Sequence, residues 1–205
     1  DFRGVNVTIP YKRLAASVCD RLDPVAARIG GVNTVVRERD GSLSGYNTDY
    51  FGFRAAMERA GLAAAGKKAL VLGSGGTSAT VRAALADMGA REIVTVSRRG
   101  PVRYGDLAAH ADAQLIVNTT PVGMYPDTGI SPVDLSVFPG LQGVMDVIYN
   151  PLRTALLLSA QDLGVPCANG LYMLVAQAAR AARLFTGGGA DESLAEPVYR
   201  KLARD

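Results

Sequence analysis

The fold is decided by residues 69–88, which read ALVLGSGGTSATVRAALADM. A short apolar strand pattern leads directly into a glycine-rich turn, and the residues after the turn carry the apolar spacing of a helix. Short apolar strands recur downstream over residues 92–96, 115–118 and 144–148, separated by segments able to form helices. Strands and helices that alternate in this way indicate a parallel sheet covered on both faces. The sequence therefore predicts an α/β fold with a doubly wound parallel sheet.

The turn after the first of these strands has the composition of a dinucleotide-binding loop. Glycines allow a backbone to approach a pyrophosphate, and the start of a helix offers unpaired N–H donors to it. An ordinary turn between a strand and a helix is the alternative, but the strand, loop and helix stand in the order that the fingerprint requires. The cofactor-binding residues predicted here are Gly73, Ser74, Gly75, Gly76 and Thr77.

The end of the next strand indicates which dinucleotide is bound. Sites for NAD usually carry an acidic residue there, which accepts a hydrogen bond from the ribose 2′-hydroxyl. This chain has Ser97, Arg98 and Arg99 instead. Two guanidinium groups suit a 2′-phosphate, although a solvated turn would also explain them. We predict that the cofactor is NADP, held in a Rossmann-type sheet.

A lysine and an aspartate stand out in the first quarter of the chain. Residues 4–12 read GVNVTIPYK and residues 45–49 read GYNTD, so Lys12 and Asp49 each follow a short strand pattern. A solvated lysine and an aspartate that caps a helix are the ordinary explanations, and Asp49 is expected to cap the helix that follows it. When hydride reaches a ketone carbon, charge develops on the oxygen, which a nearby cation or acid can stabilise and protonate. Lys12 and Asp49 are therefore the predicted catalytic pair.

Composition excludes several other classes of protein. Hydrophobic residues make up 48% and charged residues 20% of the chain, and the net charge is only +3. Without a basic run, nucleic-acid binding is not expected, and one histidine with two distant cysteines leaves few ligands for a transition metal. No apolar run has the length of a membrane span, so we expect no membrane partner and a cytoplasmic location.

Six separated motifs resemble the shikimate dehydrogenase family, and the resemblance covers nearly the whole chain. In chain order they are Gly4-x-Asn6-Val7-Thr8-x-Pro10-x-Lys12, Val32-Asn33-Thr34, Asn47-Thr48-Asp49, Asn118-Thr119-Thr120-Pro121-x-Gly123-Met124, Tyr149-Asn150-Pro151 and Gly170-x-x-Met173-Leu174-x-x-Gln177. The resemblance implies NADP-dependent, reversible reduction of 3-dehydroshikimate to shikimate in aromatic amino-acid biosynthesis.

The resemblance also implies roles for single residues. Lys12 and Asp49 match the catalytic pair of the family. The positions around the substrate hydroxyls and carboxylate are Thr8, Asn33, Tyr149 and Gln177. Beyond the glycine loop and residues 97–99, the positions that contact the cofactor are Thr119, Val147, Gly170 and Met173. From the residues alone, Asn33 could bond its own turn and Tyr149 could be a buried aromatic.

The expected domains follow from the same matches. Residues 1–62 are expected to form a smaller α/β substrate-binding domain with the catalytic pair, residues 63–186 the NADP-binding domain, and residues 187–205 a helix that packs back on the body. The family has an upstream strand and helix with a Ser-x-Ser element for the substrate carboxylate, so we expect an N-terminally truncated substrate domain here. A monomer or homodimer is expected. Quinate or aminoshikimate oxidation, and a non-catalytic NADP-binding module, are the alternatives.

Overall fold

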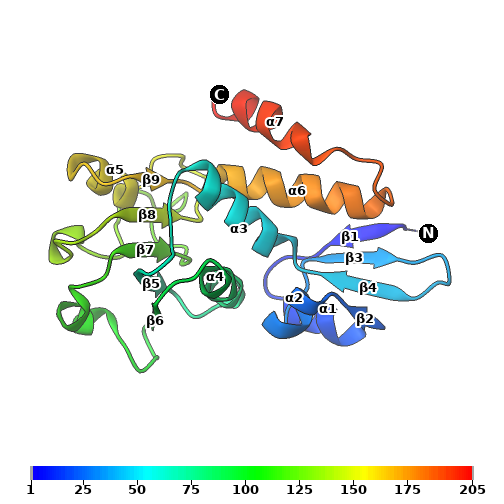
Figure 1. The fold of residues 1–205 in the computed structure, drawn as a ribbon, viewed down its shortest axis with the longest axis horizontal. Coiled ribbons are helices and arrows are strands. Elements are labelled where there is room, and N and C mark those ends of the chain that lie inside the picture. Colours follow the sequence, from blue (N-terminus) through cyan, green and yellow to red (C-terminus); the bar gives the residue numbers. More distant parts are fainter. Residues whose placement is uncertain (1, 205) are drawn as a thin grey trace. The chain divides into compact units, whose positions relative to one another are not determined.

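The computed structural model describes residues 2–204, which form two compact units (Figure 1). Unit 1 contains the residues up to Phe53 and those from Tyr172 onward, and unit 2 runs from Arg54 to Leu171. These units are defined by compactness and do not test the predicted functional domains. The domain limits 1–62, 63–186 and 187–205 therefore stay a prediction. Within residues 2–204, no helix is both long enough and apolar enough to cross a membrane.

Unit 1 is built on a four-stranded sheet in the order β1-β3-β4-β2. Its strands are β1 (Gly4–Asn6), β2 (Arg21–Leu22), β3 (Thr34–Arg37) and β4 (Leu43–Tyr46). β3 pairs antiparallel with β1 and β4, whereas β2 runs parallel to β4. β1 and β4 are the short strands expected before Lys12 and before Asp49. A turn at Asp40-Gly41 joins β3 to β4, and Gly41 has a φ of 86°.

Two short helices cover this sheet and close its small core. α1 (Lys12–Val18) and α2 (Pro24–Ile29) lie on the same side of the sheet (Figure 1). Ala15, Ala26, Val32 and Val35 form the buried cluster beneath them. The sequence analysis missed α2, although its signals are local. Asp23 accepts a hydrogen bond from the Val25 N–H, proline starts the helix, and Gly30 ends it with a φ of 70°.

Unit 1 is completed by helices from both halves of the chain. α3 (Thr48–Arg59) begins in unit 1 and continues into unit 2, and α6 (Leu171–Phe185) lies almost wholly in unit 1. The short 3₁₀ helix η3 (Glu192–Leu194) leads into α7 (Ala195–Leu202). The rings of Tyr172 on α6 and Tyr199 on α7 meet edge to face with centroids 5.3 Å apart. α7 therefore packs back on α6 within its own unit.

Unit 2 is a five-stranded parallel sheet in the order β6-β5-β7-β8-β9. The strands are β5 (Lys68–Leu72), β6 (Glu92–Val96), β7 (Leu115–Asn118), β8 (Gly143–Asp146) and β9 (Cys167–Ala168). The helices are α4 (Gly76–Asp87) and α5 (Ala155–Asp162), with 3₁₀ turns η1 (Tyr104–His110) and η2 (Leu135–Val137). Every residue of β5, β7 and β8 is buried, as in a sheet covered on both faces. The predicted doubly wound parallel sheet is confirmed.

The register of this sheet places four strand ends at one edge. Leu72 of β5 pairs with Val96 of β6 and with Asn118 of β7, and Asn118 pairs with Asp146 of β8. The chain passes from β5 to β6 on one side and then returns to β7 on the other side of β5. In open α/β sheets, ligands bind beyond the carboxyl ends of the strands where the order reverses in this way. The residues that follow β5 and β7 occupy that position.

Candidate active site

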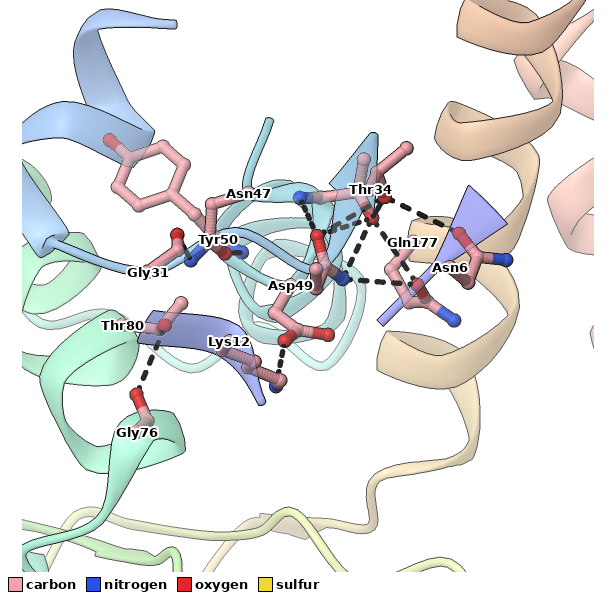
Figure 2. Close-up of polar contacts among 12 residues, drawn as sticks. Asn6, Lys12, Gly31, Thr34, Asn47, Asp49, Tyr50, Gly76, Thr80 and Gln177 are labelled. Carbon is pink, nitrogen blue, oxygen red and sulfur yellow. Dashed lines mark hydrogen bonds and ion pairs between the residues drawn. The ribbon is translucent and has the colours of Figure 1, made fainter. Parts of the chain in front are cut away.

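The predicted catalytic pair is joined by a direct ion pair in unit 1. Lys12 begins α1, Asp49 lies in the first turn of α3, and the Lys12 Nζ to Asp49 Oδ2 distance is 2.5 Å. Figure 2 shows the two side chains facing each other. Each keeps 14% of its side-chain surface exposed, so both are shielded yet within reach of solvent. A lysine N–H that is directed by a carboxylate can serve as a proton donor.

Asp49 does not cap α3, contrary to the expectation from sequence. The cap is Asn47, whose Oδ1 accepts a hydrogen bond from the Tyr50 N–H at 3.2 Å. Asn47 Nδ2 donates to the Gly31 carbonyl at 2.9 Å, which also ties the start of α3 to the loop before β3. Since Asn47 satisfies the backbone, the Asp49 carboxylate is released to pair with Lys12. The Asn-Thr-Asp sequence offered two possible caps, and only the contacts distinguish them.

A second group of polar side chains in unit 1, the Asn33 network, comprises Asn33, Thr34, Thr48 and Gln177. Asn33 Oδ1 accepts from the Thr48 N–H at 2.7 Å, and Asn33 Nδ2 lies 3.4 Å from Gln177 Oε1. Thr34 Oγ1 and Thr48 Oγ1 lie 3.1 Å apart. Figure 2 shows the dashed contacts that converge near Thr34 and Gln177. The structure therefore brings Asn33 and Gln177 together, and Asn33 does not simply bond its own turn.

The Asn33 network and the neighbouring Asn6 include residues that the sequence analysis did not select. Thr34 and Thr48 are 0% and 2% exposed, and Asn6 accepts from the Thr34 hydroxyl at 3.4 Å. Asn6, Thr34 and Thr48 all lie inside the motifs quoted above. A buried threonine, however, has no sequence feature that distinguishes it from an ordinary core residue. Thr8 is exposed, and among the described residues its side chain is joined to neither group by a hydrogen bond. Its role stays a prediction.

In unit 2, the glycine loop has the geometry that a bound diphosphate requires. Gly73 has a φ of 107°, and a Cβ there would lie 2.8 Å from Thr119 Oγ1, so only glycine fits. Gly75 precedes α4 without a side-chain cap, and a Cβ on Gly75 or Gly76 would meet nothing within 4 Å. The start of α4 therefore has no side-chain cap and leaves room beside its glycines. An anionic pyrophosphate fits this cradle, because both the donors and the helix dipole favour negative charge.

The other predicted cofactor residues surround the same edge of the sheet. Thr119 Oγ1 donates to the Leu72 carbonyl at 2.6 Å, which ties the end of β7 to the glycine loop. A Cβ on Gly170 would lie 1.9 Å from the Val147 carbonyl oxygen, so glycine is required for this close approach. Ser97 is buried, whereas Arg98 and Arg99 are exposed after β6. Exposed guanidinium groups at this strand end are free to meet a phosphate.

Two predicted residues lie in the unit that was not expected for their roles. Tyr149 is predicted to contact the substrate and Met173 to contact the cofactor. Tyr149 belongs to unit 2 and is 47% exposed, so it is not the buried aromatic of the alternative interpretation. Met173 belongs to unit 1, is 7% exposed, and lies on α6 one turn before Gln177. Its carbonyl oxygen would lie 2.5 Å from a Cβ on Gly52, which marks a close crossing of α3 and α6. The assignments of Tyr149 to substrate and Met173 to cofactor stay predictions.

A buried carboxylate that the sequence analysis did not select supports the loops of unit 2. Asp146, at the end of β8, is 0% exposed and accepts from Asn118 Nδ2 at 3.0 Å and from Thr154 Oγ1 at 2.7 Å. The Ile148 N–H also donates to it at 3.1 Å. Burial raises the pKa of Asp146, although these hydrogen bonds act in the opposite direction. The sequence signal that could have identified Asp146 is its position at the end of an apolar strand, where a charged residue is expected to need hydrogen-bond partners.

Comparison with known proteins settles the family. The profile described as the shikimate dehydrogenase substrate binding domain matches residues 1–35. A shikimate dehydrogenase (NADP(+)) of Clostridium perfringens is 38% identical over 213 residues, which cover 98% of this chain and 78% of the relative. The chain belongs to the shikimate dehydrogenase family. The resemblance noted in the sequence is therefore confirmed.

Solved structures of family members agree with this fold. A chorismate mutase/shikimate 5-dehydrogenase fusion protein from Clostridium acetobutylicum has a TM-score of 0.92 at 36% identity, over 98% of this chain and 77% of that one. Shikimate 5-dehydrogenase from Thermus thermophilus, in complex with NADP(H) and shikimate, has a TM-score of 0.84 at 38% identity, over 98% and 79%. At these identities the likeness extends beyond the fold to the family.

Proposed function

We propose that this chain is an NADP-dependent dehydrogenase that reversibly reduces 3-dehydroshikimate to shikimate. The observation that carries the proposal is the shielded Lys12–Asp49 ion pair in a chain with a glycine-rich dinucleotide loop. The Clostridium perfringens relative is named for this activity, and the Thermus thermophilus relative was solved with both ligands. Aromatic amino-acid biosynthesis is the corresponding pathway.

The two residues of the ion pair have different roles in the proposed reaction. When bound, NADPH supplies the hydride for the ketone carbon of 3-dehydroshikimate. Lys12 donates a proton from Nζ to the ketone oxygen as negative charge develops there, and it then recovers a proton from solvent. Asp49 accepts a hydrogen bond from Nζ and so holds the ammonium in place. In the reverse direction, Lys12 takes the proton from the shikimate hydroxyl.

The remaining site residues bind and orient the two ligands. Asn33, Gln177, Thr8 and Tyr149 are proposed to bind the substrate hydroxyls and carboxylate. The glycine loop, Thr119, Val147, Gly170 and Met173 are proposed to hold the cofactor. The exposed guanidinium groups of Arg98 and Arg99 would pair with the 2′-phosphate, with Arg98 as the main contact.

The test is turnover by the purified chain. Shikimate with NADP should yield NADPH at a rate well above that with NAD, and quinate at equal concentration should be the poorer substrate. Binding of NADP without oxidation of shikimate would contradict the enzyme assignment and favour a non-catalytic binding module. Faster oxidation of quinate would reassign the substrate and leave the reaction type unchanged.

We also propose that the protein acts in the cytoplasm as a monomer or homodimer with small-molecule ligands alone. Sedimentation of the purified chain, with and without NADP, would determine its oligomeric state. A trimer or larger assembly would contradict this part of the proposal.

A further inference from the structure

The orientation of the Asn33 amide is determined by a backbone group. The Thr48 N–H donates to Asn33 Oδ1 at 2.7 Å. A backbone N–H can only donate, so the carbonyl end of the Asn33 amide must face it. Asn33 Nδ2, with its two N–H donors, therefore occupies the other end of the amide. Asn33 is 4% exposed, so water has little access to compete for these groups.

The orientation of Asn33 in turn determines that of Gln177. The two donors of Asn33 Nδ2 reach Thr48 Oγ1 at 3.0 Å and Gln177 Oε1 at 3.4 Å. Because the Thr48 hydroxyl already accepts from Asn33, its own proton can go to Gln177 Oε1 or to Asn33 Oδ1, each 3.2 Å away. Asn33 Oδ1 already accepts from the Thr48 N–H and lies within reach of the Thr34 hydroxyl, so we assign the Thr48 proton to Gln177 Oε1. Gln177 Oε1 thus receives two donors. If the Gln177 amide were reversed, its N–H groups would face the N–H donor of Asn33, and the hydrogen bond from the Thr48 hydroxyl would be lost.

A close helix crossing allows Gln177 to reach this network. A Cβ on Gly52 of α3 would lie 2.9 Å from Gln177 Cβ and 2.5 Å from the Met173 carbonyl oxygen on α6. Only the absence of a side chain at Gly52 permits that approach. In Figure 2 the Gln177 amide nitrogen points away from the contacts made by its oxygen. The N–H groups of Gln177 are thus not used to build the network.

We propose that Thr48 is a positioning residue that makes Gln177 present only N–H donors to the bound ligand. The group that Gln177 recognises must then be a hydrogen-bond acceptor, such as a hydroxyl or carboxylate oxygen. An ammonium group at the same place on a ligand has no lone pair and would be rejected. The identity of that ligand as shikimate rests on the proposed function, whereas the orientation of the amide rests on the network alone.

Kinetic coupling between Thr48 and Gln177 tests this role. Thr48→Val keeps the shape and removes the hydroxyl, and we expect the KM for shikimate to rise about tenfold while the KM for NADP stays unchanged. Thr48→Ser retains the hydroxyl and should restore most of the affinity. In a Gln177→Ala background, Thr48→Val should have little further effect, because the group through which it acts is absent.

A matched control comes from the neighbouring threonine. The Thr34 hydroxyl lies near Asn33, Thr48 and Asn6. Because the Thr34 hydroxyl reaches Gln177 only through other residues of the network, the coupling of Thr34→Val with Gln177→Ala should be weaker than that of Thr48→Val. Additive effects of Thr48→Val and Gln177→Ala, or an unchanged KM in Thr48→Val, would overturn the inference.

A second measurement does not depend on turnover. NMR relaxation of the Gln177 side-chain amide should show an ordered group in the unmodified chain and in Thr48→Ser, and a mobile one in Thr48→Val. An equally ordered amide in Thr48→Val would contradict the inference even if the enzyme is active. Conversely, an ordered amide in a chain that does not oxidise shikimate would contradict the proposed function and leave the role of Thr48 intact.

Discussion

The Asn33 network of unit 1 and a matching group in unit 2 use an asparagine in the same way. We call the second group, formed by Asn118, Thr120, Asp146 and Thr154, the Asn118 network. In both, a threonine N–H donates to the asparagine Oδ1, from Thr48 at 2.7 Å and from Thr120 at 3.0 Å. The asparagine Nδ2 then donates onward, to the neutral Gln177 in unit 1 and to the carboxylate of Asp146 in unit 2.

This difference in the final acceptor separates the proposed binding role of the Asn33 network from the structural role of the Asn118 network. The Asn33 network ends at a partly exposed amide whose N–H groups are available to a ligand. The Asn118 network ends at a fully buried carboxylate that already receives three hydrogen bonds, so it has no group left for a ligand. Substitutions around the first should alter kinetics. Those in the second should alter stability and its pH dependence.

The largest expected effect separates the chemistry of unit 1 from cofactor binding by unit 2. Lys12→Ala removes the proposed proton donor, and kcat should fall by about 10²- to 10⁴-fold. NADP affinity, measured by titration calorimetry, should stay within about twofold, because the dinucleotide loop is unchanged. Arg13→Ala, at the adjacent exposed position, is the control. A Lys12→Ala enzyme with normal turnover would show that another group supplies the proton.

The next effect concerns the stability supplied by the Asn118 network. Asp146→Ala leaves the donors of Asn118, Ile148 and Thr154 without their buried acceptor, which should lower the free energy of unfolding by about 2–4 kcal/mol. Asp134 accepts from the Ser136 N–H at an exposed position, so Asp134→Ala should cost about 1 kcal/mol or less. Urea unfolding would measure both, and equal losses would mean that burial adds nothing at Asp146.

Cofactor choice should depend on unit 2 alone. Arg98→Ala removes the proposed charge-assisted contact to the 2′-phosphate, so the KM for NADP should rise about tenfold while that for NAD changes little. Arg99→Ala should have a smaller effect in the same assay. Similar losses with both cofactors would indicate that Arg98 supports the loop rather than the phosphate.

The smallest expected effect is a difference in pH dependence between the two networks. Burial raises the pKa of Asp146 in the folded chain above its unfolded value. Between these two values the folded state binds more protons, so this residue's contribution to stability is present at low pH and is lost as the pH rises through the window.

Asp146→Asn should remove this contribution and keep most of the hydrogen bonds, whereas Thr48→Val changes no ionisable group and should keep the pH profile. Urea unfolding at a series of acidic pH values would compare the three proteins. Exposed carboxyls with lowered pKa, such as Asp134 and Asp191, act in the opposite direction in all of them. The informative quantity is therefore the difference from the unmodified chain. Identical profiles for Asp146→Asn and the unmodified chain would exclude the assigned role.

Short-range physics explains what could be predicted from the sequence. The strands over residues 92–96 and 115–118 were predicted with the bounds that the structure has. Apolar periodicity and turn chemistry act over a few residues, so they are visible in a linear reading. The glycine loop and the parallel sheet follow from the same signals. α2 carried such signals as well, and its capping residues would have been enough to find it.

Long-range contacts decided the rest. The sequence alone determined the residue types of the catalytic pair and of the cofactor loop, but the Lys12–Asp49 bond spans 37 positions and the Asn33–Gln177 bond spans 144. No local pattern specifies which end of an amide meets which donor, or that Asn47 rather than Asp49 caps α3. The burial of Asp146 likewise depends on strands and loops that meet only in the folded chain. Hydrogen-bond direction and desolvation arise from such meetings, so only the tertiary structure determined them.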